Sequence, residues 1–248
     1  MSIIQGNTRR VEPPPSAGGG SLSDISEMNS LRFDGGSYLS RTFGTPTDST
    51  KYTLSFWIKR TTLGSDQFIT SRLVSPYYDA GSNFNASDNI VIGDHNAGKV
   101  TSSAKFRDTS SWYHFISQRN DANGNLVLWA NGVKFQETPA TIATSYNSAG
   151  YNVIGALNYN GYRYYFNGYL ANIHFVDGQA LDANSFGETV SDIWVPKQYG
   201  SGDPSNASQV LAEYGANGFH LDFAASNMDF SNNKVLDASG RGNDWTLN

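Results

Sequence analysis

Short stretches in which every second side chain is apolar, separated by tight turns, constrain the fold of this chain more than any other feature. The clearest stretch is residues 52–59, where alternate positions carry large apolar side chains. A period of two places such side chains on one face of a β-strand. The residues on that face are Tyr52, Leu54, Phe56 and Ile58. This pattern predicts a strand with one apolar face and one more polar face.

Residues 126–135 predict a β-hairpin. Two apolar runs flank Asn131-Gly132, and the Asn-Gly pair populates the left-handed backbone angles that a type I′ turn requires. Further strands are expected over residues 112–119, 169–175 and 218–223.

Helical periodicity is nearly absent. One turn of helix is expected over 182–186, and a short helix is expected to begin at Ser205 or Asn206 and to end at Gly215. Many short strands without helical crossovers predict an all-β fold of two antiparallel sheets packed face to face.

The composition excludes several classes of function. The 248 residues include no cysteine and carry a net charge of -5, which excludes thiol catalysis and cysteine-ligated metal sites. An acidic chain without a basic cluster is not expected to bind nucleic acid. No apolar run is long enough for membrane insertion, and the first residues lack the pattern of a secretory signal.

The first thirty residues differ from the rest. They contain three consecutive prolines and a Gly/Ser stretch, a composition typical of an extended, flexible segment. We expect residues 1–30 to form an arm, and residues 31–248 to form one domain. On a partner surface, the anchoring side chains of this arm would be Ile3, Ile4, Arg9 and Arg10. A merely disordered tail is the alternative interpretation.

Six segments, in this order, resemble laminin-G-like, concanavalin-type jelly-roll domains in the form common in proteins of tailed-bacteriophage virions. They are residues 31–39 (LRFDGGSYL), 52–60 (YTLSFWIKR), 111–114 (SWYH), 128–133 (LWANGV), 166–181 (FNGYLANIHFVDGQAL) and 237–245 (DASGRGNDW). The resemblance implies an antiparallel two-sheet jelly-roll sandwich. In many relatives the segment like 237–245 precedes the first strand, which implies that the two ends of the domain meet in one sheet.

No catalytic set is apparent in the sequence. The glutamates are few and far apart, and no strand carries the alternating carboxylates of glucanases with this fold. The histidines form no ligand pair, and His114, His174 and His220 lie in strands beside aromatic residues. We therefore expect buried, hydrogen-bonded histidines and a protein that is not an enzyme. A glycan hydrolase with an unrecognised pair of aspartates remains a distant alternative.

The resemblance also implies a calcium site at the rim of the sandwich. Asp237, Asn243 and Asp244 are the candidate ligands, with Asp34 as a fourth if the two ends meet. These side chains supply the oxygen atoms that calcium prefers. Without a metal, the same residues would form a turn that fixes the last strand, and both interpretations stay open.

Two clusters of aromatic and polar residues suit sugar recognition, which uses flat aromatic faces together with amide and guanidinium groups. The first comprises Tyr159, Tyr162, Arg163 and Tyr164, and the second comprises Tyr77 and Tyr78. The alternative is that these tyrosines pack on the sheet or cover a subunit interface.

We therefore expect a non-enzymatic display protein on the virion surface of a tailed bacteriophage: a capsid decoration, a head fibre or a tail-fibre component. It would be made in the host cytoplasm, would bind other virion proteins through its arm, and would form a homo-oligomer whose jelly rolls contact host-surface glycans. A free, calcium-dependent lectin is the alternative.

Overall fold

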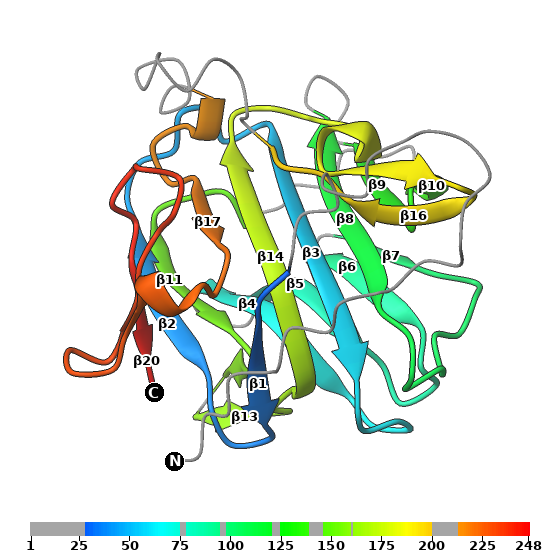
Figure 1. Cartoon of the computed structure of the whole chain (residues 1–248), viewed down its shortest axis with the longest axis horizontal. Helices are drawn as coiled ribbons and strands as arrows, with labels where there is room; N and C mark the ends of the chain where they lie inside the picture. The colour runs from blue at the N-terminus through cyan, green and yellow to red at the C-terminus, as the bar shows by residue number, and fades with distance from the viewer. Residues whose placement is uncertain are drawn as a thin grey trace.

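The strand predicted over residues 52–59 forms β3 (Tyr52–Arg60), at the middle of an antiparallel sheet (Figure 1). The structure is a computed structural model, and it describes residues 28–74, 78–94, 98–120, 125–138, 146–159, 161–199 and 213–248. Ile3, Ile4, Arg9 and Arg10, the predicted anchoring residues, lie outside these ranges.

The first sheet has the strand order β1-β14-β3-β8-β9-β10, and β17 pairs with β14 beyond the end of β1. Its strands besides β3 are β1 (Ser30–Asp34), β8 (Tyr113–Asn120), β9 (Asn125–Ala130), β10 (Val133–Thr138), β14 (Asn167–Asp177) and β17 (Phe219–Leu221).

The second sheet has nine strands, in the order β18-β19-β20-β2-β11-β4-β5-β6-β7. Its strands are β2 (Leu39–Phe43), β4 (Gln67–Val74), β5 (Tyr78–Phe84), β6 (Ile90–Asp94), β7 (Gly98–Thr101), β11 (Gly150–Ile154), β18 (Met228–Asp229), β19 (Lys234–Val235) and β20 (Trp245–Leu247). Two short hairpins complete the described strands: β12 (Leu157–Asn158) with β13 (Tyr162–Arg163), and β15 (Gly187–Val190) with β16 (Ile193–Pro196).

The core between the two sheets is rich in aromatic side chains. Leu54, Phe56 and Ile58 of β3 all point into it, as their alternation predicts. Phe106 meets Phe115 edge to face, with ring centroids 4.7 Å apart and planes at 90°, an arrangement that aromatic pairs favour. The predicted all-β, two-sheet jelly-roll sandwich is confirmed.

The predicted hairpin turn and the predicted helical turn both form. Asn131 and Gly132 adopt φ angles of 47° and 80°, as the predicted type I′ turn requires, and Asp182 caps the 3₁₀ helix η3 (Ala183–Ser185). In β14, however, the register shifts between Ala171 and His174, and Asn172 has a φ of 42°. This β-bulge changes which side chains face the core.

The last strand, β20, pairs with β2 rather than with β1. Leu247 lies opposite Leu39, and the backbones of Tyr38 and Asn248 exchange two hydrogen bonds. Strand β1 belongs to the other sheet. The last strand therefore does meet the N-terminal part of the domain, but through its second strand.

Among the described residues, no helix is long and apolar enough to cross a membrane.

Candidate functional site

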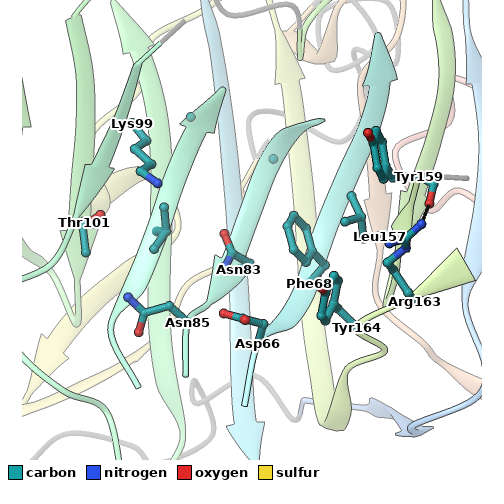
Figure 2. Close-up of a pocket in the computed structure, with 13 residues that line it drawn as sticks. Asp66, Phe68, Asn83, Asn85, Lys99, Thr101, Leu157, Tyr159, Arg163 and Tyr164 are labelled. Carbon is teal, nitrogen blue, oxygen red and sulfur yellow. Dashed lines mark hydrogen bonds between the residues drawn. The ribbon is translucent and has the colours of Figure 1, made fainter. Parts of the chain in front are cut away.

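A groove with a volume of about 440 Å³ crosses the outer face of the second sheet, over β4, β5, β6 and β7 (Figure 2). The strand register aligns its side chains in two rows. In the first row, Lys99 lies opposite Gly93, and Gly93 lies opposite Gly81. In the second row, which crosses β7, β6, β5 and β4, Thr101 lies opposite Val91. Val91 lies opposite Asn83, and Asn83 lies opposite Phe68. The groove thus runs across the strands.

The pair Gly81 and Gly93 makes the sheet hollow at this place. Two glycines directly opposite each other leave a stretch of sheet surface without side chains. Gly81 is also required by its backbone, because a Cβ atom there would lie 2.0 Å from the carbonyl oxygen of Thr70. Gly93 has a φ of 124°, a conformation that residues with a Cβ rarely adopt.

Aromatic side chains form one wall of the groove. Phe68 comes from β4, while Tyr159 and Tyr164 come from the segment around the β12–β13 hairpin. The rings of Phe68 and Tyr164 lie 6.2 Å apart, and the backbone N–H of Phe68 donates to the carbonyl oxygen of Tyr164 over 2.8 Å. Tyr164 is 47% exposed. Its ring is therefore held beside Phe68 while one side stays open to solvent.

Arg163 supports this wall. Its guanidinium lies 5.1 Å from the centroid of the Tyr159 ring and donates to the carbonyl oxygen of Tyr159, as the dashed line in Figure 2 marks. A cation over an aromatic face is attracted to it, so the pair holds its geometry within the groove.

Polar side chains form much of the rest of the lining, together with Val91 and Leu157. Asn83, Lys99 and Thr101 stand on β5 and β7, and none of their side chains has a hydrogen-bonding partner within the part of the chain that the structure describes. Asp66 and Asn85 stand at one end, where each accepts hydrogen bonds from backbone N–H groups of residues 86–89. The lining therefore offers amide, ammonium and hydroxyl donors opposite an aromatic wall.

The groove contains three of the six residues proposed for sugar binding or an interface, namely Tyr159, Arg163 and Tyr164. Tyr162 lies elsewhere. Its ring stacks on Tyr38 with centroids 4.0 Å apart, and its hydroxyl lies 3.0 Å from that of Tyr151. Burial and these phenolic neighbours raise the pKa of Tyr162. For this residue the packing interpretation fits the structure.

Tyr77 lies outside the described residues. Tyr78 begins β5, in the same sheet as the groove, and its side chain is outside the described part.

The predicted calcium ligands form a hydrogen-bonded turn. The carboxylate of Asp237 accepts from the backbone N–H groups of His220, Ser239 and Asn243 and from the hydroxyl of Ser239, over 2.8–2.9 Å. Four donors occupy the accepting positions of this carboxylate. The side-chain oxygen of Asn243 accepts from Arg41, and Asp244 accepts from the backbone N–H of Asp237.

As placed, these oxygens fit a structural turn better than an open cation cage. Asp34 closes a turn of its own, where its Oδ1 accepts from Gly36 and Ser37, and the hydroxyl of Ser37 lowers its pKa. Among the described residues, no group of three or more His, Asp or Glu side chains is arranged to hold a metal. The calcium site stays a prediction.

The outer face of the first sheet is covered instead of hollowed. Residues 178–199, here called the covering segment, pass over it with η3 and the β15–β16 hairpin (Figure 1). Ala183 and Phe186 of this segment are buried with Ile116 and Val176 of the sheet, and Tyr214 joins the same cluster.

His114 and His174 lie beneath this cover. His114 Nε2 lies 2.8 Å from the hydroxyl of Ser55, and His114 Nδ1 accepts from the indole N–H of Trp194 over 3.0 Å. His174 Nδ1 lies 2.9 Å from the hydroxyl of Tyr214, and its ring stacks on that of His220 at 3.9 Å. Burial lowers the pKa of His114 to about 3 and lowers that of His174 well below its usual range. The prediction of buried, hydrogen-bonded histidines is confirmed for these residues.

Glycosidase chemistry of the usual kind requires two carboxyl groups on either side of the scissile bond. Among the described residues that line the groove, Asp66 is the one carboxylate. The chemistry that the lining does offer is stacking and hydrogen bonding.

Sequence reasoning missed the residues of β4–β7 that line the groove. They are Phe68, Gly81, Asn83, Val91, Gly93, Lys99 and Thr101, with Asp66 and Asn85 just outside β4 and β5. The sequence shows which side chains share a face within each strand, because they alternate with a period of two. The alignment of residues 81, 93 and 99, however, depends on how three strands pair. That register is not written in any one segment.

Comparison with known families identifies the domain. The family model described as the concanavalin A-like lectin/glucanases superfamily matches residues 33–185. The chain belongs to this superfamily. A search of curated proteins finds no match.

One solved structure with a TM-score above 0.5 is similar in fold, and two others align with lower scores. A candidate carbohydrate-binding protein from Bacteroides ovatus aligns with a TM-score of 0.60 and 14% identity, over 89% of this chain and 58% of that protein. Domain 4 of the extracellular arabinanase AbnA from Geobacillus stearothermophilus, solved with arabinotriose, aligns with a TM-score of 0.49 and 15% identity, over 73% of this chain and 83% of that domain. Domains LG4-5 of the mouse laminin α1 chain give a TM-score of 0.46 and 13% identity, over 68% of this chain and 45% of theirs. This chain therefore spans little more than half of the Bacteroides protein.

Proposed function

We propose that this domain is a non-catalytic carbohydrate-binding module whose binding site is the groove on the second sheet. The observation that carries the proposal is an aromatic wall facing unpartnered polar donors across a hollow in the sheet. Aromatic faces stack on the C–H faces of sugars, and the amide, hydroxyl and ammonium groups are suited to sugar hydroxyls. Membership of a superfamily named for lectins and glucanases supports the same assignment.

The absence of catalysis is part of this proposal. It rests on Asp66 being the one carboxylate among the described lining residues, where a pair is needed. Release of reducing ends from a polysaccharide by the purified protein would contradict it.

Binding is tested on a glycan array and then by titration calorimetry, with the wild type and the variants Phe68→Ala and Tyr164→Ala. We expect each variant to bind at least about tenfold more weakly, a change of about 1.4 kcal/mol. The matched control is Phe230→Ala, because Phe230 is an aromatic side chain that is 55% exposed away from the groove. Equal binding by all four proteins would contradict the assignment of the groove.

We further propose that the domain is displayed on the virion of a tailed bacteriophage, as a capsid decoration, a head fibre or a tail-fibre component, and that the N-terminal arm attaches it. The support is the resemblance of residues 31–39, 166–181 and 237–245 to phage virion proteins, and the Pro- and Gly-rich composition of the first residues. A homo-oligomer on the particle would multiply weak contacts with host-surface glycans.

The arm is tested by deletion of residues 1–27, because β1 begins at Ser30 and must stay intact. We expect the truncated protein to unfold at the wild-type temperature and to be missing from assembled particles. Normal incorporation would contradict the anchoring role.

The alternative of a free, calcium-dependent lectin is tested by calorimetric titration with calcium and by melting with and without a chelator. Since donors occupy the oxygens of Asp237, we expect no calcium uptake there and an unchanged melting temperature. Calcium uptake that Asp237→Asn abolishes would revive the lectin alternative.

A further inference from the structure

One end of the groove carries the lysine side chain of Lys99, and this charge narrows the class of ligand. Lys99 stands on β7, at the end of the row that continues through Gly93 and Gly81. Because these two glycines have no side chains, the row is an open trough that begins at the ammonium group of Lys99. Figure 2 shows Lys99 on the side of the groove opposite to Tyr159 and Arg163.

The far end of the trough is closed by the backbone around β12. Ser71 follows Gly81 in the same row, and its hydroxyl donates to the carbonyl oxygen of Ala156 over 2.7 Å. Leu157 and Tyr159 line the groove just beyond. From β7 to β4 the trough crosses three strand spacings, about 14 Å at about 4.8 Å each. It therefore suits a short linear oligosaccharide better than a single sugar ring.

The charged side chains of the lining lie in different parts of the groove. Lys99 is exposed, and within the described part of the chain its ammonium group has neither an ion pair nor a hydrogen bond. The carboxylate of Asp66 lies at the other end of the strands, beside Asn85, and accepts from the backbone N–H of Ala86. With Arg163 the lining carries two cations and one anion, whereas the whole chain has a net charge of -5. The groove is thus a locally positive site on an acidic protein.

We propose that the groove binds an acidic oligosaccharide that lies across the strands, with a carboxylate of the sugar on Lys99 and uncharged rings against Phe68 and Tyr164. This inference rests on the proposed function and adds the class of ligand and its direction. A lysine ammonium is a compact point charge that pairs well with an anionic group, and a charge-assisted hydrogen bond is about twice as strong as a neutral one. Asp66 lies at the other end of the strands, outside the row that begins at Lys99, so it leaves the Lys99 end of the trough favourable for an acidic group.

The test uses matched probes: tetragalacturonate, its carboxyl-reduced neutral counterpart, and a glycan array that includes sialylated and neutral members. Binding is measured by calorimetry for the wild type and for Lys99→Gln. We expect the wild type to prefer the acidic member of a matched pair by about tenfold, and Lys99→Gln to remove that preference while it retains binding of the neutral member. The preference should also weaken with added salt.

The control is Lys197→Gln, which removes the same charge from the covering segment, where the Lys197 ammonium donates to the carbonyl oxygen of Asn184. This variant should keep the full preference for acidic probes. Equal binding of acidic and neutral probes by the wild type, or a preference unchanged in Lys99→Gln, would overturn the acidic-ligand inference and leave the carbohydrate site standing. No binding to any glycan would overturn both.

Discussion

One outer face of the sandwich is covered and the other is open, although both belong to antiparallel sheets whose side chains alternate in the same way. The face of the first sheet carries the large side chains of Trp57, His114 and His174, which are all buried. Trp194 and Phe186 of the covering segment lie against His114 and His174. The face of the second sheet carries Gly81 and Gly93 on β5 and β6, near one edge of the sheet, and it stays open there as a groove. Large, partly apolar side chains on an outer face require a second layer, whereas a pair of glycines creates a site.

The largest expected difference between the two faces is their response to acid. A histidine whose pKa is lower in the folded than in the unfolded protein takes up its proton on unfolding. The stability that it contributes is fully present above about pH 6.5 and is lost as the pH falls from there toward the folded value, which for His114 is about 3. Each such histidine costs roughly 1.4 kcal/mol per pH unit in that window.

We therefore expect the free energy of unfolding to fall steeply between pH 6.5 and 4.5, as measured by urea denaturation at several pH values. Replacement of one of the buried histidines, His114→Gln, should make the slope shallower. A free energy that stays constant over this window would show that the covered face opens to water without unfolding.

The loss of unfolding free energy on truncating one phenylalanine on each face compares the contributions of the covering segment and the groove wall to stability. Phe186 is buried in the covering segment, so Phe186→Ala should reduce the free energy of unfolding by about 3 kcal/mol, near the lower end of what buried phenylalanines cost. Phe68→Ala, in the groove wall, should cost about 1 kcal/mol. Urea denaturation compares the two, and equal losses would mean that the groove wall is as much a part of the core as the cover is.

A bulky side chain should fill the open face without disturbing the fold. Val91 points outward between Thr101 and Asn83 in the second row, so Val91→Trp should weaken glycan binding at least about tenfold, or about 1.4 kcal/mol. Its melting temperature should stay near that of the wild type. Val133→Trp is the control, since Val133 is exposed on the far hairpin. Undiminished binding by Val91→Trp would place the site outside the groove.

The smallest effect is expected at Tyr162, which lies near the groove but packs away from it. Tyr162→Phe removes the hydroxyl that meets Tyr151, which should cost up to about 1 kcal/mol of stability. Calorimetry should show unchanged glycan binding. A loss of binding would return Tyr162 to the site.

The sequence predicted the elements better than their arrangement. Period two located β3, and Asn131-Gly132 located the hairpin, because both signals are local. Tyr159, Arg163 and Tyr164 were found because they are clustered in the chain. Lys99, Asn83 and Gly93 were not found, because only the register of three separate strands brings them together. The more polar face of β3 is not a solvent-exposed one, because Thr53 and Ser55 are both buried. Thr53 exchanges hydrogen bonds with the backbone of Gln179 and Leu181, more than a hundred residues later.

The bulge at Asn172 shifts the alternation of β14, so that different side chains face the core before and after it. Before it, Leu170 fills the core, and after it Ile173 and Phe175 do so, while His174 turns to the covered face. If β14 kept Asn172 but had no bulge, strict alternation would exchange the two faces from residue 173 onward. The imidazole of His174 would then lie in the hydrophobic core, and Ile173 and Phe175 would leave it. The local conformation of one asparagine therefore decides which face of this strand is buried.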